Sequence, residues 1–80
     1  MRADENKVDD AVLALLYITS FRERDSVRAW KGFDWDALDR LHEKGMIHSP
    51  RSTAKSVVFT DDGLKRAKEL FESMLARPSA

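Results

Sequence analysis

The sequence predicts an α+β domain built from three or four helices and a two-stranded antiparallel hairpin. Hydrophobic residues repeat at helical spacing in an early, a middle and a late segment. Between the middle and late segments, a polar turn is followed by a short β-branched stretch, which is typical of a hairpin. The 80 residues fit one domain, residues 1–80, with an ordered core at about residues 7–76.

Residues 7–21 predict the first helix, because Val12 and Leu16 lie four residues apart in a segment with helical spacing. Apolar side chains occur on every side of this segment, so it must be covered on more than one flank. It is either the central helix of the domain or a helix that also lies in a subunit contact. Residues 21–32 have no clean period and predict a loop, or a short helical turn at 26–30, with Trp30 as an anchor to the core.

Asp34 predicts the start of the next helix, because a carboxylate at the N-cap accepts hydrogen bonds from the amides of the first turn. Trp35, Leu38 and Leu41 are expected to form its inward stripe. The helix is expected to end at residue 44, because Gly45 follows where a left-handed backbone conformation is favoured.

The predicted hairpin pairs residues 46–49 with residues 56–59 around a polar loop that projects from the domain. Thr60 then predicts the N-cap of the last helix, which keeps its apolar period to about residue 76. Gly63 in the first turn lowers helix propensity, which indicates close backbone packing at that position.

This order of elements is that of a winged-helix domain. Residues 41–47 (LHEKGMI) resemble the junction between recognition helix and wing in bacterial winged-helix regulators of the multiple-antibiotic-resistance type, and residues 57–63 (VVFTDDG) resemble the junction between wing and final helix. From residue 7 to residue 71 the chain also resembles a family of short bacterial proteins of unknown function. The first resemblance implies a DNA-binding, regulatory module, but a shared fold does not establish function.

The charge distribution argues against base reading by the middle helix. The chain has 14 basic and 14 acidic residues, whereas nucleic-acid-binding domains usually carry a basic excess. The outward face of residues 35–44 sets two bases, Arg40 and Lys44, against three acids, a poor match to phosphates and guanine edges; the acids are Asp36, Asp39 and Glu43. Pairing of Arg40 with Asp36 or Glu43 would make this a solvated helix face.

The segments on either side of the middle helix are more basic, so double-stranded DNA could be held there by phosphate contacts that position it without reading its sequence. The candidate contacts are Arg22, Arg24, Arg28, Lys31, Arg40, Arg51 and Lys55. Arg51 and Lys55 have an equally good alternative role, which is to keep an exposed hairpin edge soluble.

The alternative function is a protein-interaction or homodimerisation module that does not bind nucleic acid. The first and last helices carry more apolar surface than a small core readily covers, although the two helices could simply cover each other. The candidate dimer contacts are Val12, Leu16, Phe71, Met74 and Leu75.

The residue inventory argues against an enzyme. The chain has no cysteine and two histidines, and it carries no glycine-rich phosphate loop, so no catalytic residue, metal, cofactor or small-molecule ligand is predicted. Trp30 and Trp35 are interpreted as core anchors rather than as surfaces for stacking bases. The longest apolar run is far shorter than the ~20 residues that span a bilayer, so we expect a cytoplasmic protein without membrane contact.

Overall fold

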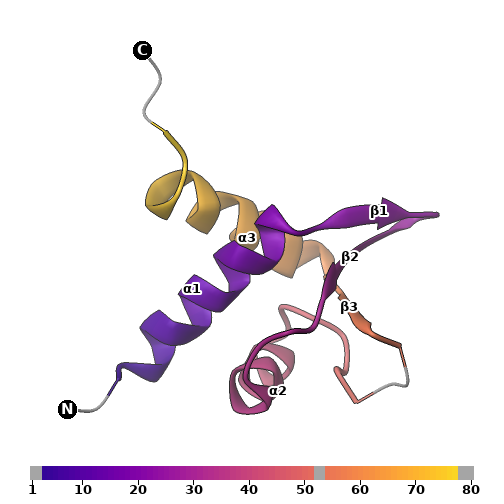
Figure 1. The fold of residues 1–80 in the computed structure, drawn as a ribbon, viewed down its shortest axis with the longest axis horizontal. Helices are drawn as coiled ribbons and strands as arrows, with labels where there is room; N and C mark the ends of the chain where they lie inside the picture. The colour runs from indigo at the N-terminus through magenta and orange to yellow at the C-terminus, as the bar shows by residue number, and fades with distance from the viewer. Residues whose placement is uncertain (1–2, 52–53, 78–80) are drawn as a thin grey trace.

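The computed structural model describes residues 3–51 and 54–77, which form three helices and a three-stranded antiparallel sheet (Figure 1). The sheet order is β1-β2-β3. The α+β class is therefore confirmed. The elements in chain order are α1 (Glu5–Ile18), β1 (Phe21–Glu23), β2 (Ser26–Trp30), α2 (Trp35–Glu43), β3 (Ser56–Val58) and α3 (Asp61–Met74).

The starts of the helices follow from local sequence. Asp34 caps α2 by accepting a hydrogen bond from the Ala37 amide, and the Thr60 hydroxyl accepts one from the Gly63 amide at the start of α3. Both caps agree with the prediction. The first helix begins earlier than predicted, because Asp4 also supplies a cap for its first turn.

Two glycines have the roles that the sequence predicts. Gly45 ends α2 with φ +78°, in the left-handed region that disfavours other residues. At Gly63 an added Cβ would lie 1.6 Å from the carbonyl oxygen of Met46, so the start of α3 packs directly on the backbone that follows α2. Gly63 is therefore required by close packing.

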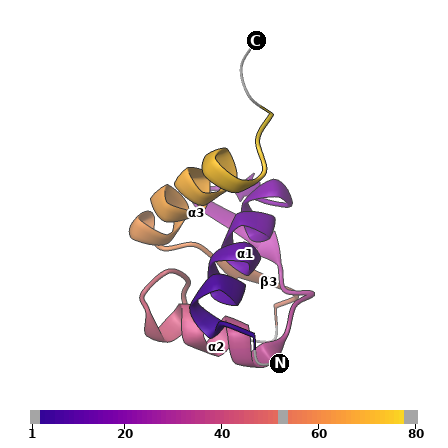
Figure 2. The ribbon, with the colours of Figure 1, turned by 90° about the vertical axis from the view of Figure 1, so that its left-hand side faces the viewer.

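The hydrophobic core lies between the helices and one face of the sheet. Figure 2 shows α1 and α3 side by side, with β3 behind α1. The largest buried core side chains come from α1, from α2 and from the segment that follows it, and from β3: Leu13, Leu16, Leu38, Leu41, Ile47 and Val57. None of the helices described at residues 3–51 and 54–77 is long and apolar enough to cross a membrane.

The prediction for residues 21–32 is wrong, because this segment forms the β1–β2 hairpin rather than a loop or a helical turn. Val27 and Ala29 point toward the helices, and Ala29 is fully buried. Arg28 and Trp30 alternate with them, which is the period of a strand. Arg24 lies in the turn with φ 55°. The hairpin extends away from the helices and is the projecting element of the fold (Figure 1).

The predicted pairing of residues 46–49 with 56–59 is also wrong as a two-stranded hairpin. Among the described residues the two segments share a single bridge, between Ile47 and Phe59. Pro50 directly follows the segment 46–49 and has no amide hydrogen to donate, so the pairing cannot continue as a ladder at that position. β3 pairs instead with β2, with Val57 opposite Ala29. The core position of Ile47 and the exposed position of His48 agree with the prediction.

Candidate nucleic-acid interface

The sheet face that points away from the helices carries an aromatic pair. Phe21 lies opposite Arg28 in the register, and Trp30 lies opposite Ser56, so these side chains share one face. The rings of Phe21 and Trp30 have centroids 5.3 Å apart at an interplanar angle of 37°. We call this surface, made of Phe21, Arg28, Trp30 and Ser56, the sheet face.

Trp30 is 56% exposed, so its predicted role as a core anchor is wrong. The physical reason is the alternation of the strand: Ala29 takes the inward position, and its neighbour must point outward. The contact with Phe21 supports the indole without burying it. The sheet face therefore presents an aromatic ring to solvent.

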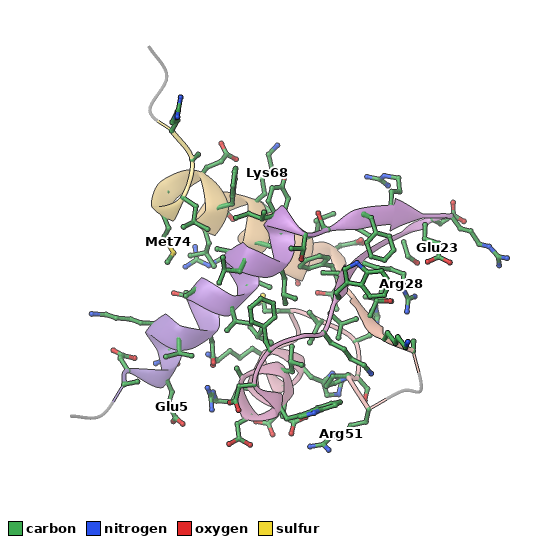
Figure 3. The ribbon with its side chains drawn as sticks, viewed as in Figure 1. Glu5, Glu23, Arg28, Arg51, Lys68 and Met74 are labelled. Atoms are coloured by element: carbon green, nitrogen blue, oxygen red, sulfur yellow. The ribbon has the colours of Figure 1, made fainter. Side chains whose placement is uncertain are left out.

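Arg28 lies on the sheet face beside this aromatic pair and is held in place from two sides. Its Nε donates a hydrogen bond of 2.7 Å to the Ser56 hydroxyl, and the same nitrogen lies 3.9 Å from the Glu23 carboxylate. Figure 3 shows Arg28 on the hairpin, with Glu23 farther out toward its tip. The guanidinium is thereby oriented while the long Glu23 contact neutralises it only weakly.

The two basic flanks that the sequence predicts meet at Trp35. The Lys31 ammonium lies 5.4 Å from the centroid of the indole ring, and the Arg51 guanidinium carbon lies 5.0 Å from it. Lys31 also donates to the carbonyl oxygen of Pro50, at 2.8 Å, and Arg51 to the Asp39 carboxylate, at 2.6 Å. The electron-rich face of an aromatic ring attracts cations, so the Trp35 ring holds the side chains of Lys31 and Arg51 close to each other.

Trp35 is 46% exposed, and its predicted place in the inward stripe of α2 is wrong. The buried face of α2 is made by Ala37, Leu38 and Leu41. Trp35 stands in the first turn, at the edge of that face, where Lys31 and Arg51 cover its ring instead of the core.

Three further basic residues lie in the same segments, and of these Arg22 shares its side of the sheet with Val27, opposite the sheet face. Arg22 and Arg24 are exposed on the hairpin, and Lys55 is exposed just before β3. The Lys31 amide donates to the Lys55 carbonyl oxygen at 3.1 Å, so these two backbone positions are neighbours. Within residues 3–51 and 54–77, the side chains of Arg22, Arg24 and Lys55 form no ion pair.

The charges of the neutral chain are segregated. Residues 20–33 and 45–60, which contain the sheet and its adjoining loop, hold six basic and two acidic residues. The rest of the chain, mainly the helices, holds eight basic and twelve acidic residues. A chain of zero formal charge therefore has an excess of four positive charges in the sheet segments and an equal negative excess elsewhere.

Arg40 belongs to a different part of the molecule. Its Nη2 lies 2.8 Å from Oδ1 of Asp9 on α1, its Nε lies 2.9 Å from Oδ2, and Lys44 Nζ lies 2.8 Å from Oδ2 as well. The Asp9 side chain is only 1% exposed. Arg40 therefore ties α2 to α1, and the predicted pairing with Asp36 or Glu43 on its own helix is not what the structure contains.

The pKa values at this α1–α2 junction reflect the pairing. Burial raises the pKa of Asp9, but the hydrogen bonds and charges of Arg40 and Lys44 outweigh burial, and the net shift is downward. The pKa of Arg40 is raised, chiefly by its hydrogen bond to Asp9. Because Arg40 and Lys44 point toward α1, the outward face of α2 is left to Asp36, Asp39 and Glu43.

The candidate dimer contacts fall into two groups. Val12 and Leu16 are 8% and 0% exposed, so they belong to the core of a single chain and are not available as a contact surface. Phe71 is half-buried against Tyr17, with ring centroids 5.3 Å apart. Met74 is 49% exposed and lies at the far end of α3 from Glu23 and Arg28 (Figure 3).

The exposed apolar residues of α1 and of the end of α3 are only partly those that the sequence predicts. Leu75 is 44% exposed, as expected for a surface residue. Leu15 and Ile18 on α1 are 40% and 53% exposed and replace Val12 and Leu16 as the open side of that helix.

Sequence reasoning missed Asp9 and the sheet face. The signal for the sheet face is present, because Val27-Arg28-Ala29-Trp30 alternates apolar inward and long outward positions. Asp9 carries no comparable signal: its partner Arg40 lies 31 residues away, and the acidic residues around Asp9 are indistinguishable from a solvated helix face.

Two comparisons with known proteins find relatives of this chain, and neither relative has a known function. Residues 4–77 match the family described as "Domain of unknown function (DUF6429)". The chain is 54% identical over 77 residues to "Uncharacterized protein y4hR" of Sinorhizobium fredii (strain NBRC 101917 / NGR234), an alignment covering 96% of this chain and 100% of that protein. No solved structure matches. The chain therefore belongs to the DUF6429 family, whose function is unknown.

Proposed function

We propose that this protein is a non-enzymatic binding module that holds nucleic acid, including double-stranded DNA, through phosphate contacts made by the sheet segments. The observation that carries the proposal is the segregation of charge: the positive excess of a neutral chain is concentrated in residues 20–33 and 45–60, which contain the β1–β2 hairpin, Lys31 and the loop before β3. Phosphate neutralisation by such residues supplies affinity that does not depend on sequence.

The proposed contacts are the basic side chains of these segments. They are Arg24, Arg28, Lys31, Arg51 and Lys55; Arg22, which pairs with Val27 on the helix-facing side of the sheet, is left out. Arg40 is left out because it is engaged with Asp9. Lys31 and Arg51 lie over the same indole ring, which supports the idea that the two basic segments act as one surface.

The winged-helix resemblance enters this proposal only in part. A winged-helix protein would insert α2 into the major groove, but the acidic outward face of α2 disfavours that position. The projecting element is the β1–β2 hairpin, which precedes α2 instead of following it. Backbone binding through the hairpin and its neighbouring loop is therefore proposed in place of base reading by α2.

The test is a fluorescence-anisotropy titration of labelled duplex and single-stranded oligonucleotides at low and moderate salt. We expect affinity to fall steeply with salt, with a log–log slope of about −4 for about five phosphate contacts. The double substitution Arg24→Glu, Lys55→Glu should weaken binding at least about tenfold and flatten the slope by about 2.

Arg77→Glu is the matched control, because Arg77 is exposed just beyond α3 and lies outside the basic surface. This control should leave both affinity and slope unchanged. Absence of binding to either oligonucleotide at low salt, or equal loss of binding in the control, would overturn the proposal.

Homodimerisation is a second candidate, favoured by one observation. Leu15 and Ile18 on α1 and Met74 and Leu75 at the end of α3 are 40–53% exposed, and this is apolar area that a contact with a second copy of the chain would cover. Sedimentation at high micromolar concentration tests it: a monomer at that concentration removes this function, and a dimer that Met74→Glu dissociates supports it.

A further inference from the structure

Phosphate binding alone does not explain why the Trp30 ring is exposed on the sheet face. We infer that the sheet face stacks unpaired bases, so that single-stranded nucleic acid is the preferred ligand of the basic surface. This inference rests on the proposed function, and it adds the form of nucleic acid that is bound and the residue that selects it, which is Trp30.

The first argument is the exposure of Trp30. An 80-residue domain has few large side chains with which to build a core, yet one of its two tryptophans is 56% exposed. Phe21 supports the indole at a centroid distance of 5.3 Å, so the ring is braced in position while most of its surface stays open. A braced and open indole is suited to stack on a flat, unsaturated ligand.

The second argument is the charge around the ring. Arg28 lies on the same face and is oriented by the Ser56 hydroxyl. Lys55 directly precedes Ser56, the cross-strand neighbour of Trp30, and is exposed. A nucleotide whose base stacks on Trp30 would thus have the Arg28 guanidinium on the same face for a flanking phosphate, with Lys55 at the adjoining end of β3. This combination of an aromatic platform with a positive groove is how proteins hold single strands without sequence preference.

The third argument separates single strands from duplexes. In a duplex, both faces of each internal base are already covered by its neighbours, so an indole on a strand can stack only on bases that are unpaired. Deep insertion of α2 into a groove is disfavoured by Asp36 and Glu43 on its outward face. The sheet face therefore gains an interaction from a single strand that a duplex cannot supply.

Trp35 provides an internal comparison. Its ring already has the Lys31 ammonium at 5.4 Å and the Arg51 guanidinium carbon at 5.0 Å, whereas within the described residues the Trp30 ring has an aromatic contact with Phe21 and no cation over its face. Trp30 is therefore the stacking residue, and Trp35 holds the neighbouring cations.

The two tryptophans make the inference directly measurable. The variant Trp35→Phe leaves Trp30 as the only indole, and the variant Trp30→Phe leaves only Trp35. On titration with a short oligothymidylate, the fluorescence of Trp30 should be strongly quenched by base stacking. That of Trp35 should change little.

Affinity provides the second readout. Trp30→Ala should weaken oligothymidylate binding by about 5- to 150-fold, the range for loss of one stacked base, and should leave the weaker duplex binding unchanged. Trp30→Phe keeps a ring and should stay within a few-fold of the parent. Circular dichroism verifies that each variant is folded, which is expected for substitution of an exposed side chain.

Two different failures are distinguishable. Salt-dependent binding in which the duplex is held as tightly as the single strand, or in which Trp30→Ala has no effect, overturns the stacking inference and leaves the proposed function standing. Absence of salt-dependent binding to either form overturns both. Quenching of Trp30 together with preferential loss of single-strand binding in Trp30→Ala supports the inference.

Discussion

The α1–α2 junction and the surface around Trp30 and Trp35 use the same kinds of cation in opposite ways. At the junction, Arg40 and Lys44 converge on Asp9, whose side chain is 1% exposed. Around the tryptophans, Lys31 and Arg51 lie over an indole ring that is itself half exposed. The junction sets two carboxylates, Asp9 and Glu5, against its two cations, whereas the surface around Trp35 sets one carboxylate, Asp39, against Arg51 and adds the cation of Lys31 over the ring. The comparison teaches that only the second region retains positive charge for a ligand.

The largest expected effect on the free energy of unfolding is at the α1–α2 junction. Asp9→Ala leaves Arg40 and Lys44 facing each other without their shared carboxylate, so the free energy of unfolding should fall by about 2–4 kcal/mol. Urea denaturation measures it. Asp10→Ala is the matched control: its side chain is 44% exposed and 4.0 Å from Arg66, so it should cost less than about 0.5 kcal/mol. Equal losses in the two variants would show that burial of Asp9 has no energetic consequence.

The second effect is the pH dependence of the junction. Because the folded-state pKa of Asp9 is lowered, its contribution to stability is fully present above the unfolded pKa, near 3.9, and is lost as pH falls through the lower folded value. The parent protein should therefore lose stability below about pH 4 more steeply than Asp9→Asn does. Urea midpoints measured from neutral pH downward check this, and parallel curves would contradict it.

A smaller effect is expected on the sheet face. Trp30→Ala removes a cross-strand aromatic contact with Phe21 but uncovers no core residue, so the loss of unfolding free energy should stay below about 1 kcal/mol. Thermal unfolding is the measurement. A loss as large as that of Asp9→Ala would mean that Trp30 holds the hairpin to the fold, and it would remove the distinction between the two regions.

The smallest effect is expected at Arg51. Its ion pair with Asp39 and its position over Trp35 are both on the surface, and its side chain is 64% exposed. Arg51→Ala should therefore lower the free energy of unfolding by only about 0.5 kcal/mol, and less at high salt. A urea titration at two salt concentrations measures both. A large, salt-independent loss would place Arg51 with Arg40 as a structural residue.

Much of the local architecture could be predicted from the sequence. The caps at Asp34 and Thr60, the left-handed Gly45 and the close approach at Gly63 depend on residues within a few positions of one another. The basic candidates Arg22 to Lys31 and Arg51 to Lys55 were also recognisable, because charge is read directly from residue type. The meeting of Lys31 and Arg51 at Trp35 was not.

Pairing between distant segments was decided by the tertiary structure. Residues 56–58 have the β-branched pattern of a strand, but this pattern does not specify which segment they pair with. In the structure β3 pairs with β2 rather than with residues 46–49. The exposure of Trp30 has the same origin: alternation shows that Ala29 and Trp30 point to opposite faces, but only the packing of the helices decides which face is covered.

By itself, then, the sequence determined where the second and third helices begin, that the class is α+β, and that positive charge lies in the segments around the middle helix. These depend on short-range hydrogen bonding, periodicity and residue type, which are local properties. Only the tertiary structure decided that Asp9 meets Arg40 across 31 residues and that an indole stands open on a basic sheet. Both depend on which surfaces come together when the chain packs, and that choice is made by the whole fold at once.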